Sequence, residues 1–144
     1  MEISTMGKVL VPAKIENLND LYEVSVGTRK PEKVRRIEVT DALVDTGAMH
    51  LMLPRRFVEQ LGLERYRTRR AKTTGGVTDI PMCGMVLLTV QGRDCRLEIG
   101  EIPDDCPVLI GQIPLESLDF VVDPVHQQLI GNPEHGGEHM IEWY

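Results

Sequence analysis

The sequence predicts an all-β fold with one or two short helices. Apolar and polar residues alternate along most of the chain, which is the pattern of strands that have one face in solvent. Glycine-containing turns separate these segments, and only two stretches, each with a proline near its start, are expected to be helical. The chain has 144 residues, which is enough for one domain with a hydrophobic core.

The first half of the chain is expected to contain three strands and one helix. Residues 8–15 and 21–26 alternate between apolar and polar side chains, and the charged, Gly- and Pro-containing residues 27–33 predict a loose hairpin connection. Residues 34–44 then return as a strand that becomes more apolar toward its end. Residues 54–62 predict a short helix, with proline near its start and glycine at its end.

The second half of the chain is expected to consist mainly of hairpins. The basic residues 65–72 predict an exposed strand, which a turn at 73–78 connects to a returning strand at 80–90. The other expected elements are a turn at 91–94, a strand at 95–99, an apolar strand at 107–111, helical turns at 114–118 and a hairpin of 120–123 with 128–130. The Gly- and His-rich residues 132–144 form a C-terminal tail after a domain at residues 1–131.

Charge and cysteine content narrow the possible classes of function. The net charge of −6 argues against a nucleic-acid partner, because nucleic-acid binding needs a clustered positive surface. Residues 1–10 contain no long apolar run and no segment approaches membrane-spanning length, so we expect no signal peptide and no membrane partner. Cys83, Cys95 and Cys106 are odd in number and lack CxxC spacing, which favours a reduced, cytoplasmic protein with idle thiols.

The triplet Asp45-Thr46-Gly47 is the strongest candidate for a functional site. It follows an apolar run, so the carboxylate is carried from the end of a buried strand onto a tight loop. Taken alone, the triplet is equally compatible with an ordinary turn, because all three residues are turn formers. A second apolar strand ending in glycine, residues 107–111, lies downstream and favours the functional interpretation.

These motifs resemble the aspartic proteases of the retroviral, or retropepsin-like, type, and especially small stand-alone bacterial members. The resemblance spans roughly residues 6–130. It implies a closed acid-protease barrel in which one Asp-Thr-Gly loop per subunit makes half of an active site, with no cofactor and a protein or peptide substrate. The chain contains a single such triplet, so the second carboxylate must come from a second copy, and we expect a homodimer.

The resemblance also implies a role for each residue of the loop. Asp45 and its symmetry copy would share a proton and activate a water molecule. The Thr46 hydroxyl would reach across the twofold axis to the partner loop, and the Gly47 N–H would hold the carboxylate in plane. Ala48 stands where pepsin-like enzymes usually have a hydroxyl, which implies a less acidic working pH. His50 is either a pH-sensitive neighbour or, as such residues more often are, a surface or satisfied histidine.

The sequence Thr74-Gly75-Gly76-Val77 resembles the flap tip of this family, a hairpin that folds over the substrate. Its two glycines leave backbone N–H groups accessible to a peptide. A plain hairpin turn is the alternative, but the position of the motif about 30 residues after Asp45 favours a flap. The expected substrate-binding residues are Ala48, Thr74, Gly75, Gly76, Val77 and Ile110.

Two other clusters have less specific interpretations. The basic residues at 65–72 fit either a preference for acidic substrates or, more simply, a solvated edge strand. His135 and His139 have a spacing found in metal sites on helices, but Gly136 and Gly137 between them disfavour a helix. We therefore expect no metal site.

The sequence thus predicts an aspartic endopeptidase that hydrolyses peptide bonds through an Asp dyad formed across a homodimer. The alternative is a retropepsin-fold binding or dimerisation module with little or no proteolytic activity. Ala48 and Met49 leave room for the alternative, because Met49 departs from the residues that the family commonly has at this place.

Overall fold

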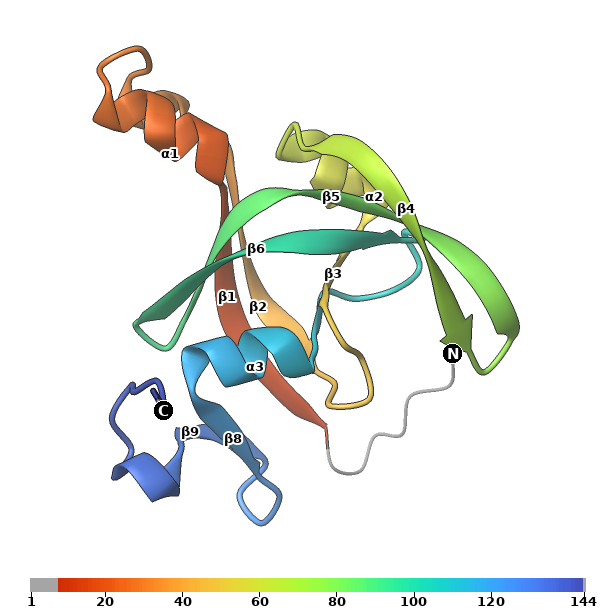
Figure 1. Cartoon of the computed structure of the whole chain (residues 1–144), viewed down its shortest axis with the longest axis vertical. Coiled ribbons are helices and arrows are strands. Elements are labelled where there is room, and N and C mark those ends of the chain that lie inside the picture. The colour runs from red at the N-terminus through yellow and green to blue at the C-terminus, as the bar shows by residue number, and fades with distance from the viewer. Residues whose placement is uncertain (1–7, 144) are drawn as a thin grey trace.

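The computed structural model describes residues 8–143 as a ring of strands with short helices around it (Figure 1). Residues 1–7 of the predicted domain and Tyr144 of the predicted tail lie outside the described residues. The strands of the main sheet are β1 (Val9–Asn17), β2 (Arg36–Val44), β3 (Leu51–Pro54), β4 (Glu64–Thr73), β5 (Gly76–Val90), β6 (Arg93–Ile102) and β7 (Leu109–Ile110).

The main sheet closes on itself. Its strand order is β1-β2-β7-β3-β6-β5-β4, and β1 pairs with β5 as well as with β2. The six strands other than β4 therefore form a closed ring, while β4 is attached to the outside of the ring through β5. The prediction of an all-β, closed acid-protease-like barrel is confirmed.

The interior of the ring is filled by alternate residues of its strands. The buried apolar side chains of β1 and β6 are Val9, Val11, Ala13, Ile15, Cys95, Leu97 and Ile99. Fully burying one large aliphatic side chain contributes about 1.5–3 kcal/mol to stability. The ring is therefore a stable frame for the loops that connect its strands.

Two of the three α-helices were expected, and one was not. α2 (Arg55–Gln60) and α3 (Gln112–Leu118) lie in the segments predicted to be helical. α1 (Leu18–Ser25) occupies the segment in which alternation predicted a strand at residues 21–26, so that prediction was wrong. None of the helices within residues 8–143 is long and apolar enough to cross a membrane.

Polar interactions at the start of α1 explain why a helix forms there. The side-chain oxygen of Asn17 accepts a hydrogen bond of 3.0 Å from the Asp20 N–H and caps the helix. The buried carboxylate of Asp20 in turn accepts from Arg35 Nε and Nη2, both at 2.9 Å. The cap and the ion pair stabilise a helical turn here, although the short alternation of apolar and polar residues is typical of a strand. After α1 the chain passes through the 3₁₀ helix η1 (Pro31–Lys33) instead of the expected hairpin connection.

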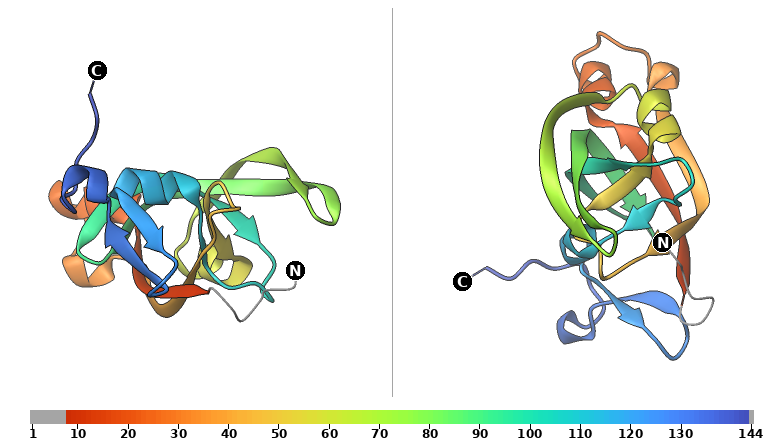
Figure 2. Two further views of the ribbon diagram at one scale, coloured as in Figure 1. Left: turned by 90° about the horizontal axis from the view of Figure 1, so that it is seen from below. Right: turned by 90° about the vertical axis from the view of Figure 1, so that its right-hand side faces the viewer.

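β4 and β5 form a long hairpin that projects beyond the ring (Figure 2). Every residue of β4 except Ala71 is exposed, which confirms the predicted exposed strand. Arg65 and Arg67 at its base form ion pairs with Glu101 and Glu98 of β6. The far end of the hairpin makes no contribution to the buried core of the ring within the described residues.

The C-terminal part of the chain forms a second, two-stranded sheet beside α3, as expected (Figure 1). Its strands are β8 (Phe120–Asp123) and β9 (Gln128–Gly131), and the 3₁₀ helix η2 (Pro133–His135) follows them. Leu129 of this hairpin belongs to the same hydrophobic core as the ring. The Arg93 guanidinium donates to the carbonyls of Leu118 and Gly137, so it connects the end of α3 and the residues after η2 to β6.

The cysteines form no disulfide within the described residues. Cys83 and Cys95 are buried, and burial raises the pKa of each thiol to about 11. Cys106 is partly exposed, and burial raises its pKa as well. A raised pKa keeps a thiol protonated and unreactive near neutral pH, which agrees with the prediction of idle thiols.

Candidate active site

The Asp45 loop connects β2 to β3, and β7 lies between these two strands. β7 pairs with β2 in parallel, Val44 facing Ile110, and with β3 antiparallel. The Leu43 N–H donates to the Val108 carbonyl at 2.8 Å, and the Asp45 N–H donates to the Ile110 carbonyl at 3.0 Å. The two apolar strands singled out in the sequence are therefore neighbours, and the second one fixes the backbone of Asp45.

The far side of the loop is also held through its backbone. The N–H groups of Gly111, Gln112 and Ile113 donate in turn to the carbonyls of His50, Ala48 and Met49, at 3.1, 2.8 and 2.9 Å. A Cβ atom on Gly111 would lie 2.5 Å from the His50 oxygen and 2.6 Å from the Ala48 oxygen. Only glycine allows the start of α3 to approach the loop this closely.

The loop presents the Asp45 carboxylate in a defined orientation. The Gly47 N–H donates to Asp45 Oδ1 at 2.9 Å, which is the bond that the resemblance implied, and the Ala48 N–H donates to the Asp45 carbonyl at 3.0 Å. Asp45 is half-buried, whereas Thr46 and Gly47 are exposed. The carboxylate therefore lies at the surface of one chain, where the backbone N–H of Gly47 fixes its orientation.

Thr46 projects from the same loop toward solvent. Within residues 8–143 its hydroxyl makes no hydrogen bond, and its side chain is exposed. A small β-branched residue at the tip of a rigid loop has a restricted χ1 angle, so the direction of the hydroxyl is limited in advance. The hydroxyl is free to bond with a group outside the chain.

The four residues predicted as a flap tip lie at the end of the β4–β5 hairpin. Thr74 and Gly75 form the turn, and Gly76 and Val77 begin β5, with 61% of Val77 exposed. Gly76 has φ +114°, a conformation that L side chains rarely adopt. No hydrogen bond joins these residues to the Asp45 loop in the described part of the chain, so the hairpin tip is open to solvent.

Ile110 differs from its predicted role. Its side chain is completely buried in the core, so it does not line a surface that a substrate could reach in this chain. Its contribution is the carbonyl that accepts the Asp45 N–H. An apolar residue before a glycine has the same appearance in a sequence whether it faces a cleft or a core.

Met52 and Ile80 are two further side chains of this region that the sequence did not single out. Both point toward Gly100 of β6, where a Cβ atom would be 2.8 Å from Met52 Sδ and 3.1 Å from Ile80 Cγ2. Each is only partly buried. They come from strands distant in sequence, so only the glycine at position 100 hinted at a close approach.

His50 lies in the loop after Asp45 and is partly buried. Burial lowers its pKa first, and the positive charge of Arg69 lowers it further. The lowered pKa favours a neutral imidazole at physiological pH, and the ring makes no hydrogen bond within residues 8–143.

The C-terminal histidines contact acidic and backbone groups of the same region. His135 Nδ1 lies 2.6 Å from Asp119 Oδ2, and His139 Nε2 lies 3.0 Å from the Ser117 carbonyl oxygen. Among residues 8–143, no group of three or more His, Cys, Asp or Glu residues is arranged to hold a metal ion. Each of the two histidines therefore hydrogen-bonds to a group of the protein, and the two rings are not arranged around a common metal position.

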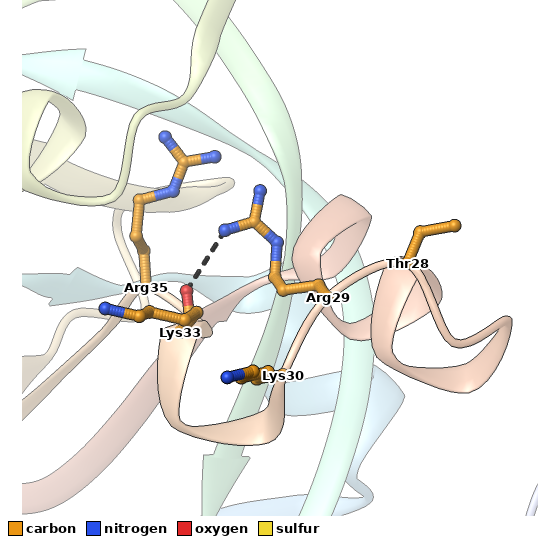
Figure 3. Close-up of a pocket in the computed structure, with 5 residues that line it drawn as sticks. All are labelled: Thr28, Arg29, Lys30, Lys33 and Arg35. Carbon is orange, nitrogen blue, oxygen red and sulfur yellow. Dashed lines mark hydrogen bonds between the residues drawn. The ribbon is translucent and has the colours of Figure 1, made fainter.

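Two surface hollows of the single chain lie away from Asp45. One is lined by Thr28, Arg29, Lys30, Lys33 and Arg35 (Figure 3). Its two guanidinium groups are already paired with Asp20 and Glu23, and Arg29 also donates to the Lys33 carbonyl. The other is lined by residues of β1, β2 and β5 and includes no residue of the loop or the hairpin tip.

Residues 33–133 match a family model described as aspartyl protease. The match covers more than half of the chain and includes the Asp45 loop, the β4–β5 hairpin and Gly111. No curated protein is significantly similar to the chain in sequence.

Proposed function

The chain belongs to the aspartyl protease family, and we propose that it is a homodimeric endopeptidase whose active site contains Asp45 from each of two copies. Family membership supports a protease-like function. The dimer follows from the chain itself, because residues 1–144 contain one Asp-Thr-Gly triplet and the chemistry needs two carboxylates. The observation that carries the proposal is the surface position of the Asp45 carboxylate on a loop fixed by its backbone.

The proposed mechanism follows from bringing two carboxylates together. Two Asp45 side chains within hydrogen-bonding distance do not both ionise, so the pair holds one proton, as in aspartic proteases generally. The ionised carboxylate accepts a proton from a water molecule, which attacks the peptide carbonyl carbon. The protonated carboxyl donates to the carbonyl oxygen, which gives a tetrahedral intermediate with two hydroxyl groups. As the C–N bond breaks, the carboxyl that took the proton from water donates it to the leaving amine, and the other carboxylate takes a proton back from one hydroxyl group. The Gly47 N–H keeps the carboxylate oriented during these transfers.

The exposed side chain of Thr46 supports a contact between the two loops. Its hydroxyl has no partner within residues 8–143 and is free to donate across the twofold axis to the partner loop. A bond of this kind, made twice by symmetry, would hold the two carboxylates at a fixed separation.

The β4–β5 hairpin supplies the proposed substrate cover. A peptide in the extended conformation binds to a hairpin through main-chain hydrogen bonds, which give affinity without sequence preference. A Cβ atom on Gly76 would meet nothing within 4 Å, so the backbone of a peptide can approach the hairpin tip closely. Closure of two such hairpins would exclude water from the reacting bond.

Cleavage of unfolded protein or a peptide library by wild type and by Asp45→Asn tests the proposal. The substitution keeps the shape of the side chain but removes its acid–base function, so kcat is expected to fall by about 10²–10⁴-fold. Asp41→Asn is the matched control, because Asp41 is an exposed carboxylate of the same strand, β2. Cleavage that is equal in Asp45→Asn and wild type would reject the aspartic mechanism.

Mixing the two proteins tests the dimer directly. If each active site needs two Asp45 carboxylates, a fixed amount of wild type should lose about half of its activity after subunit exchange with an equal amount of Asp45→Asn. A wild type that cleaves as a monomer would be unaffected. A folded dimer with no cleavage from pH 4 to pH 7 would instead support the binding or dimerisation module.

A further inference from the structure

The pairing of β4 with β5 shows which side chains face inward from the hairpin. Arg67 is opposite Met82 and Arg69 is opposite Ile80 in the antiparallel register. Directly opposed residues project on the same face of a sheet. Met82 is buried and Ile80 points toward Gly100 of β6, so this face is turned toward the ring. Arg67 and Arg69 therefore lie on the inner face of the hairpin.

The positive charges on this inner face are not equally compensated. Arg67 Nη2 is hydrogen-bonded to Glu98 Oε1, and Arg65 Nη2 lies 2.6 Å from Glu101 Oε1. Arg69 is exposed and has no ion-pair partner among residues 8–143. The charged groups around it, Arg67 and Glu98, cancel each other, so one net positive charge remains at Arg69.

The remaining charge faces the strand that follows the Asp45 loop. Ile80, which is opposite Arg69, and Met52 of β3 both lie against Gly100 of β6, so this face of the hairpin is turned toward β3. His50 is neutral at physiological pH, so its ring neither adds a second positive charge nor compensates the charge of Arg69. The His50 carbonyl is bonded to Gly111 at the base of the loop, and the positive charge of Arg69 adds to the effect of burial in lowering the pKa of the His50 imidazole. A peptide covered by the hairpin would pass this group.

We propose that Arg69 selects substrates that carry an acidic side chain in the peptide segment beneath the hairpin. This inference rests on the proposed function, because it assigns a substrate class to the same site. A guanidinium binds a carboxylate through two parallel hydrogen bonds, and such a charge-assisted pair strengthens where water is excluded. A symmetric dimer contributes one Arg69 to each half of the cleft, so acidic residues are favoured on both sides of the cleaved bond.

The test uses a peptide that wild type cleaves and its isosteric partner, in which the acidic residues are changed from Glu to Gln. A hydrogen bond to a charged group favours the acidic peptide in wild type by about 10–100-fold in kcat/KM. Arg69→Gln should remove this preference, and Arg69→Glu should shift it toward a peptide with Lys at these positions. Arg70→Gln is the matched control, because Arg70 lies on the opposite face of β4 near Asp79. It should keep the wild-type preference.

Equal kcat/KM for the two peptides in wild type, or a preference that survives Arg69→Gln, would overturn the inference. Binding of the same peptides to Asp45→Asn, which does not depend on cleavage, distinguishes a failure of this inference from a failure of the proposed function. If wild type cleaves no peptide, a preference of Asp45→Asn for acidic peptides that Arg69→Gln removes would still support the role of Arg69. Equal affinity for acidic and amide peptides would reject it.

Discussion

The loop after Asp45 and the C-terminal segment, residues 132–143, are both irregular, yet different bonds hold them in place. Backbone N–H groups of Gly111, Gln112 and Ile113 bind the carbonyls of the loop. The C-terminal segment is held to a large extent through one side chain, the carboxylate of Asp119. The loop therefore depends on how closely two backbones approach, whereas the C-terminal segment depends on the charge of one residue.

Asp119 binds three separate parts of the C-terminal segment. Its Oδ2 accepts from the Met140 N–H at 3.0 Å and lies 2.6 Å from His135 Nδ1, while Oδ1 accepts from Asn132 Nδ2 at 3.3 Å. The hydrogen bond with His135 lowers the pKa of Asp119 to about 2. Asp119, and then Glu142, raise the pKa of His135. The two partners therefore favour each other's charged form.

Of the substitutions that test this difference, Gly111→Ala should have the largest effect on stability and activity. Its Cβ atom would meet two carbonyl oxygens at 2.5 and 2.6 Å, both of which belong to the backbone and move only with the loop. The overlap should lower the free energy of unfolding by about 1–3 kcal/mol and should displace Asp45. We expect loss of most of the proposed peptidase activity, measured with denaturant unfolding and peptide cleavage.

Gly75→Ala is the control for Gly111→Ala in the unfolding measurement. A Cβ atom there would have only Thr73 Oγ1 nearby, at 3.8 Å, so unfolding should be almost unchanged. If Gly111→Ala is as stable and as active as wild type, the close approach at position 111 does not control the loop.

Asp119→Asn should have a smaller and more local effect. Asn tolerates the left-handed φ of 57° found at position 119, so the backbone can keep its course. Loss of the negative charge weakens the bonds to His135 and Met140, and amide exchange at Met140 should become several-fold faster. Exchange at Gly111 and Gln112 should not change.

Asp123→Asn is the control, because Asp123 pairs with His126 inside the β8–β9 hairpin and not with the C-terminal segment. Unchanged exchange at Met140 in Asp119→Asn would show that other contacts hold the segment.

The smallest expected effect is a dependence of the C-terminal segment on pH. The pKa of Asp119 is lowered, so its contribution is complete above the ordinary value of 3.8 and is lost as the pH falls toward 2. The pKa of His135 is raised, so its contribution is complete below the ordinary value of 6.5 and is lost as the pH rises through the raised value. Protection of the Met140 amide, corrected for intrinsic exchange, should be greatest between about pH 4 and pH 6.5.

His135→Gln provides the comparison for this profile, because it removes the titrating ring. It should remove the decline at high pH, and the Gly111 amide should show no such profile in either protein. A flat profile for Met140 in wild type would contradict the proposed coupling of the two side chains.

Local signals in the sequence predicted much of the candidate site. The apolar run before Asp45, the glycine at 111 and the two glycines at 75 and 76 each express a requirement of the nearby backbone, and the structure has the expected loop and hairpin there. Ile110 was predicted to bind substrate, whereas its side chain is buried, because an apolar residue does not indicate in a sequence which surface it faces. α1 was mistaken for a strand, because the Asp20–Arg35 ion pair that stabilises it joins residues 15 positions apart and leaves no local pattern in the sequence.

The sequence by itself determined the Asp45 loop, the order of most strands and the presence of a single Asp-Thr-Gly triplet in residues 1–144. The tertiary structure decided the closure of the ring by β1 and β5, the inward direction of Arg69 and the convergence of three segments on Asp119. The physical reason is the range of the interactions. Turns, caps and alternation act over a few neighbouring residues, whereas register, burial and ion pairs depend on residues that only folding brings together.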